Sequence, residues 1–144
     1  NPMTPRRTAV ELELISRIDQ DGDCTETRTF AQGELTHLRD SLTLAYPEPD
    51  QSSRTRIRLS ESGQALIQRT GEFSGQIPVC PGEWADFLYH PPSGYLELAC
   101  EGLSLVLEEE DTAGRLVLHY RMGTPDGQVI SENHITILYK ESAN

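Results

Sequence analysis

The segment Val10-Glu11-Leu12-Glu13-Leu14 alternates strictly between apolar and acidic residues, and Ile18 continues the apolar parity. Since successive side chains of a β-strand point to opposite faces, this alternation predicts a strand with one buried and one solvated face. The dipeptide Asp21-Gly22 follows and is typical of a tight hairpin turn, because glycine accepts the positive φ that such turns require. The chain from Cys24 to Phe30 is therefore expected to return as the second strand.

Further strand-like stretches recur about every ten residues and are separated by Pro, Gly, Ser and Asp. After a short piece at 35–38, they are residues 42–46, 53–59, 65–70, 73–79, 84–89, 95–100, 103–109, 115–121 and 129–139. No segment carries a sustained helical stripe, although Glu34 to Ser41 also fits one helical turn. So many short strands must close or stack to hide their edges. The sequence predicts an all-β, antiparallel closed barrel of about 8 to 10 strands, with a β-sandwich as the alternative.

The chain has 144 residues and a mass of 16.1 kDa, which predicts a single domain over residues 1–144 with an ordered core at about 8–140. Its apolar runs are too short to span a membrane, and the acidic residues from Glu11 onward do not suit a signal peptide. The three cysteines, Cys24, Cys80 and Cys100, are odd in number and widely spaced, so we expect no disulfide framework and a cytoplasmic location.

Acidic residues outnumber basic ones, 23 to 12, and the net charge is −11. An acidic surface repels phosphate backbones and anionic lipids, so we expect neither nucleic acid nor a membrane as a partner. No nucleophile motif and no glycine-rich phosphate loop is present, so we expect no catalytic residues and no cofactor.

Several short segments, in this order and spacing, resemble an uncharacterised bacterial family, the YwiB-like proteins. They are Gly33, Leu44-Ala45-Tyr46, Thr55-Arg56-Ile57-Arg58-Leu59, Ile67-Gln68-Arg69-Thr70-Gly71, Tyr89 with the turn ending at Gly94, Leu116 to Arg121, and Ile130 to Ile135. The resemblance spans about Val10 to Tyr139. It implies a calycin-like, or lipocalin-like, barrel of unknown function, and it assigns no activity.

Arg69 is the most specific candidate for a binding residue. If Ala65 and Ile67 face the core, Arg69 shares their parity and points inward, where an unpaired charge would be costly. One interpretation is that Arg69 binds a small anionic ligand at the barrel mouth, with Tyr89 and Tyr120 as further lining residues. The other is a structural ion pair with an acidic neighbour such as Glu72 or Glu97.

Arg54, Arg56 and Arg58 alternate along one strand and are expected to face solvent. They form a candidate partner patch in an otherwise acidic protein, and a charged face that discourages edge pairing explains them equally well.

The histidines His37, His90, His119 and His134 lie on separate segments, so the sequence predicts no metal site. A barrel that binds a small molecule is the first functional hypothesis. A protein-interaction or regulatory module acting through its outer surface is the second, and an enzyme is the third.

Overall fold

The computed structural model describes residues 4–50 and 52–143, which form one antiparallel sheet of ten strands closed into a barrel. Residues 1–3, 51 and 144 of the predicted domain lie outside the described residues. Each strand pairs with the next one along the chain, and β1 closes the barrel by pairing with β10. The strands are β1 (Arg6–Gln20), β2 (Asp23–His37), β3 (Ser41–Pro47), β4 (Ser53–Ser60), β5 (Ala65–Gly71), β6 (Ser74–Val79), β7 (Trp84–His90), β8 (Leu96–Glu109), β9 (Ala113–Gly123) and β10 (Val129–Glu141).

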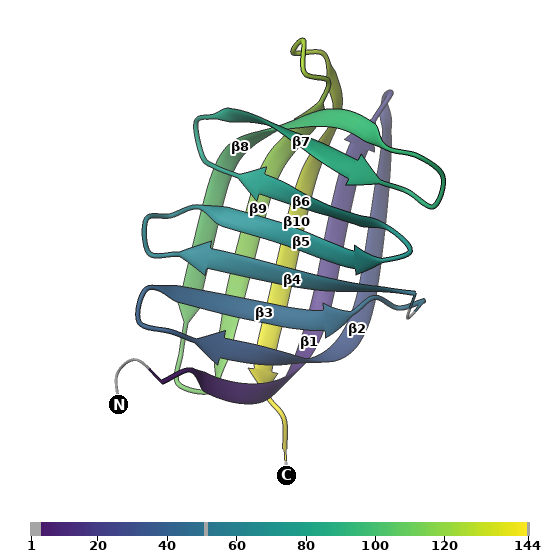
Figure 1. Cartoon of the computed structure of the whole chain (residues 1–144). Coiled ribbons are helices and arrows are strands. Elements are labelled where there is room, and N and C mark those ends of the chain that lie inside the picture. The colour runs from purple at the N-terminus through teal and green to yellow at the C-terminus, as the bar shows by residue number, and fades with distance from the viewer. Residues whose placement is uncertain (1–3, 51, 144) are drawn as a thin grey trace.

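The barrel is flattened into two layers whose strands cross steeply (Figure 1). The short strands β3 to β7 form one layer, and the long strands β8, β9, β10, β1 and β2 form the other. The long strands β2 and β8, at the two edges, each pair with strands of both layers. The end of β2 from Glu34 to His37 pairs with β3, and the start of β8 from Leu96 to Glu101 pairs with β7. These two pairings join the layers into one closed sheet. The predicted barrel is therefore confirmed, and the alternative of a β-sandwich is not formed.

Apolar side chains of alternating parity line the interior. Val10 and Leu12 are buried while Glu11 between them is exposed, as the opening alternation predicts. The fully buried side chains come from both layers, so one core fills the space between them. They are Leu44, Ile57, Val79, Cys100, Leu116, Leu118 and Ile137, together with Val10. Within the described residues, no helix has the length and hydropathy to cross a membrane.

The second strand is longer than predicted. The prediction that it ends at Phe30 was wrong, because β2 continues through Gly33 to His37. The helical turn considered for Glu34 to Ser41 is absent. Gly33 allows this continuation because β2 passes very close to β3 there: a Cβ atom on Gly33 would lie 2.3 Å from the carbonyl oxygen of Ala45.

Replacing Gly33 with alanine is expected to destabilise the barrel by about 2 kcal/mol. The added methyl group would clash with the Ala45 backbone and would lie 2.8 Å from Cδ1 of the buried Leu12, so β2 and β3 must move apart. Urea unfolding measures the loss. Gln32→Ala, at the exposed neighbouring position, is the control and should change stability by less than about 0.5 kcal/mol. Equal stability of Gly33→Ala and wild type would contradict the prediction.

Candidate functional site

Five residues form a row across the inner wall of the β3–β7 layer. The strand registers place Tyr46 opposite Thr55, Thr55 opposite Arg69, Arg69 opposite Gly75, and Gly75 opposite Tyr89. All five therefore share one face of the sheet, although they are separated by up to 43 positions in the chain. The inward direction predicted for Arg69 is confirmed by its direct pairing with the buried Thr55.

Arg69 makes one clear hydrogen bond in this row. Its Nη1 donates to the phenol oxygen of Tyr89 at 2.8 Å, and its guanidinium carbon lies 5.7 Å from the centre of the Phe73 ring. Its Nε is buried and makes no hydrogen bond within the described residues; the nearest carboxylate oxygen, Oε1 of Glu48, is 3.7 Å away. The guanidinium therefore keeps donors that an incoming acceptor can use.

Gly75 makes the contact between Arg69 and Tyr89 possible. These two residues lie two strands apart, or about 9.6 Å at ordinary strand spacing, and the strand between them presents only Gly75. A Cβ atom on Gly75 would lie 3.0 Å from Cδ1 of Tyr89. The long arginine side chain thus lies along a wall that has no side chain at this point.

Two buried phenols belong to the same interior. Tyr46 and Tyr120 are 6% and 8% exposed, and burial raises the pKa of each above its ordinary value. The positive charge of Arg69 opposes that rise at both phenols, so the guanidinium and the two rings share one electrostatic environment. Of the three ligand-binding residues predicted from the sequence, Arg69 and Tyr89 are in direct contact, and Tyr120 lies on the opposite layer, in β9.

The acidic partner of Arg69 differs from the one expected. Glu72 and Glu97 were the examples given for an ion pair with Arg69, and neither is its partner, because the carboxylate within ion-pair distance is that of Glu48 in the β3–β4 loop. Glu48 also accepts a hydrogen bond from the hydroxyl of Thr55, which holds its carboxylate beside the row. A sequence search confined to neighbours along the strand misses Glu48, which approaches Arg69 only after β3 and β4 pair.

The three alternating arginines lie on the outer face of β4. Arg54, Arg56 and Arg58 are exposed and the residues between them are buried, so the predicted direction is confirmed. Among the described residues, no carboxylate lies within ion-pair distance of these three guanidiniums.

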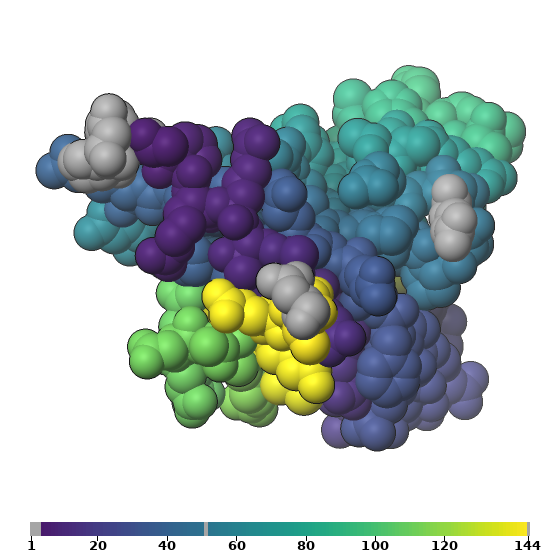
Figure 2. Space-filling view, turned by 90° about the horizontal axis from the view of Figure 1, so that it is seen from below, coloured from purple at the N-terminus to yellow at the C-terminus, as the bar shows by residue number. Residues whose placement is uncertain are grey.

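A polar cavity of about 630 Å³ opens at the lower end of the barrel, where β1, the end of β10 and the β8–β9 hairpin meet (Figure 2). His37 Nε2 lies 2.9 Å from a carboxylate oxygen of Glu109, and the Tyr139 hydroxyl donates to the same oxygen at 3.1 Å. Arg6 Nη2 approaches His37 Nδ1 at 3.3 Å. These residues were not predicted as a site, because they come from four strands and carry no shared motif.

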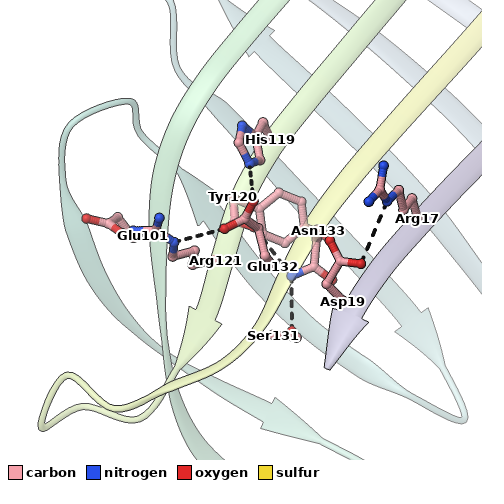
Figure 3. A network of polar contacts seen from close by, with 9 residues as sticks. All are labelled: Arg17, Asp19, Glu101, His119, Tyr120, Arg121, Ser131, Glu132 and Asn133. Atoms are coloured by element: carbon pink, nitrogen blue, oxygen red, sulfur yellow. Dashed lines mark hydrogen bonds and ion pairs between the residues drawn. The ribbon is translucent and has the colours of Figure 1, made fainter. Parts of the chain in front are cut away.

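A second polar network lies on the outer face of β9 and β10 (Figure 3). His119 Nε2 is 3.1 Å from one carboxylate oxygen of Glu132, and Arg121 Nε donates to the other at 3.2 Å. Arg121 Nη1 also donates to Glu101 at 3.0 Å. The hydrogen bonds from His119 and Arg121 hold the pKa of Glu132 below its ordinary value.

The expectation that the histidines stay scattered was wrong for two of them, because β9 and β10 pair with His119 directly opposite His134. A signal existed in the sequence: Glu132 and His134 are two residues apart and therefore share one face of a strand. That His119 lies opposite His134 could not be predicted, because it depends on the register between β9 and β10.

Fold and interior together define a class: a closed, ten-stranded, calycin-like barrel with an arginine on its inner wall. The family model for a domain of unknown function, DUF1934, matches residues 12–143, and the chain belongs to this family. A search of curated proteins found no match. The crystal structure of YwiB from Bacillus subtilis is similar, with a TM-score of 0.84 and 22% sequence identity over 95% of this chain and 94% of that one. That likeness concerns the fold, which agrees with the predicted YwiB-like barrel.

Proposed function

We propose that this protein binds a small carboxylate-bearing ligand at Arg69, on the inner wall of the barrel at a place where this side chain is 27% exposed. The observation that carries the proposal is the buried Nε of Arg69, which makes no hydrogen bond although it lies on the inner wall. A buried donor without a partner is costly, and a guanidinium matches the two oxygens of a carboxylate in shape and charge. A ligand carboxylate bonded to Nε would remove that cost.

Neighbouring side chains supply the rest of the proposed site. The Tyr89 hydroxyl holds Nη1 and so orients the guanidinium, and the Phe73 ring covers one of its faces. Tyr120 faces the same interior from β9 and offers an aromatic surface to the body of the ligand. Sites that bind small ligands generally combine a mostly apolar lining with a few polar groups that set the orientation.

Glu48 would act as an internal competitor. Its carboxylate lies 3.7 Å from Nε of Arg69, too far for a hydrogen bond and close enough to repel an incoming anion. Neutralising Glu48 should therefore strengthen anion binding, which a purely structural role of the pair does not predict.

The test is isothermal titration with a panel of small mono- and dicarboxylates and inorganic phosphate. Arg69→Met should weaken any carboxylate bound by the wild type by at least about 10-fold, because it removes a charge-assisted bond while keeping most of the volume. Glu48→Gln should tighten the same ligand by up to about 5-fold. Arg56→Met is the matched control, since Arg56 lies on the outer face of the adjacent strand. A carboxylate that binds Arg69→Met and wild type equally, or no binding by any compound, would overturn the proposal.

A second candidate is a protein-interaction module. We propose that the outer patch of Arg54, Arg56 and Arg58 contacts an acidic partner, favoured by the exposure of three guanidiniums without carboxylate neighbours among the described residues. A pull-down comparing wild type with the triple Arg→Glu variant tests it, and identical partners in both would remove the patch from consideration.

Three free cysteines, one of them exposed, support a proposed location in a reducing compartment such as the cytoplasm.

A further inference from the structure

Three potential metal ligands converge on the outer face of β9 and β10. One nitrogen each from His119 and His134 and one carboxylate oxygen of Glu132 all lie within 4.8 Å of one another. His119 is directly opposite His134 in the strand pair, and Glu132 shares its face two positions earlier in β10. Two neighbouring strands thus hold all three ligands on one rigid surface.

His134 has a ring nitrogen without a hydrogen-bond partner among the described residues. Its Nδ1 is buried and makes no hydrogen bond within the described residues, and its ring stacks on that of His119 with centroids 3.9 Å apart. A neutral imidazole nitrogen without a proton is a strong ligand for divalent transition metals.

We propose that His119, Glu132 and His134 bind one divalent transition-metal ion. Zn²⁺ is the ion for which the geometry and the test are given. Two imidazoles and one carboxylate are a donor set that Zn²⁺ accepts with a further position left open to water. The site faces outward, whereas Arg69 faces the interior, so this inference does not depend on the proposed barrel ligand.

With Glu132 included, the charged side chains in and around the cluster carry a net negative charge, which favours a divalent cation. The carboxylates of Asp19, Glu101 and Glu132 face the guanidiniums of Arg17 and Arg121 on the same outer surface (Figure 3). Three negative charges against two positive ones leave a net negative site before any metal binds.

Arg121 serves as a positioning residue for Glu132. It bonds one carboxylate oxygen and leaves the other directed at Nε2 of His119. Outer contacts of this kind fix the orientation of metal ligands in proteins.

Binding requires a small local adjustment. Donor atoms around tetrahedral Zn²⁺ lie about 3.4 Å apart, as bonds of about 2.0 to 2.1 Å dictate. His119 Nε2 and the Glu132 oxygen are already 3.1 Å apart, and the most widely spaced pair must close by up to about 1.4 Å. The stacked rings turn about their Cβ–Cγ bonds to converge, a torsion with broad energy wells. Any proton that His119 shares with Glu132 is released to solvent as the metal takes its place.

Titration of chelator-treated protein with Zn²⁺ alone tests the proposal. The wild type should bind one equivalent, and His119→Ala, His134→Ala and Glu132→Gln should each weaken binding by at least about 10-fold. His90→Ala is the control, because His90 is exposed at the end of β7 and lies outside the cluster. Arg69→Met should keep full Zn²⁺ affinity, which separates this inference from the proposed function.

A measurement on the wild type makes the test independent of variant folding. Imidazole NMR resonances of His119 and His134 should shift together and saturate at one equivalent of Zn²⁺, while those of His90 stay in place. No saturable binding, or saturation that leaves the two histidine signals unchanged, would overturn the proposal. Undiminished binding by a folded His119→Ala/His134→Ala variant would overturn it as well.

Discussion

Raising the pH from 9 to 11 is expected to lower the free energy of unfolding by about 4 kcal/mol through three buried phenols. Tyr46, Tyr120 and Tyr139 are almost fully buried, and burial raises the pKa of each in the folded state. In the unfolded chain these phenols lose their protons near pH 10, whereas the folded barrel retains them. The unfolded state then binds fewer protons, so each phenol contributes stability below pH 10 and loses about 1.4 kcal/mol of it by pH 11.

The buried thiol of Cys100 acts in the same direction. Its burial raises the pKa to about 12, so its contribution begins to fall near pH 9. Urea unfolding at pH 9 and pH 11 measures the combined loss. Tyr120→Phe should remove about one third of the phenol effect, while Tyr95→Phe, at a phenol that is 63% exposed, should leave the pH profile as in the wild type. A free energy of unfolding that stays constant across this range would contradict the prediction.

Replacing Leu118 with alanine is expected to destabilise the barrel by about 3 to 4 kcal/mol. Leu118 is completely buried in β9, between Leu105 of β8 and Ile135 of β10. Removing three carbon atoms leaves a cavity that two hydrogen-bonded neighbouring strands cannot collapse to fill.

The matched control is Val106→Ala on β8. Val106 lies on the outer face and is 45% exposed, so its truncation should cost less than about 0.5 kcal/mol. Urea midpoints with unchanged m-values report both effects. A loss below about 1 kcal/mol for Leu118→Ala would indicate that the core around β9 is loosely packed.

The strands were predictable because their signals are local. Alternation at Val10 to Leu14 and the turn at Asp21-Gly22 depend on neighbours in the chain, and both appear in the structure as predicted. The end of β2 was missed, since a glycine inside a strand resembles a break until the close approach of β3 is known.

The candidate sites were predictable only in part. Parity placed Arg69 inside and Arg56 outside, because side-chain direction in a strand follows from residue number once one buried neighbour is known. The partners of those side chains were not predictable: Glu48 reaches Arg69 from a loop, and His119 meets His134 across two strands.

Residue order alone therefore determined an all-β antiparallel chain and the face on which each side chain lies, since both follow from a two-residue period and local turn chemistry. The tertiary structure decided which distant residues meet, because barrel closure and strand register set those distances. A shift of two residues in the β9–β10 register would keep each side chain on its face and would still separate His119 from His134, so their meeting depends on the register that the β9–β10 turn and barrel closure set.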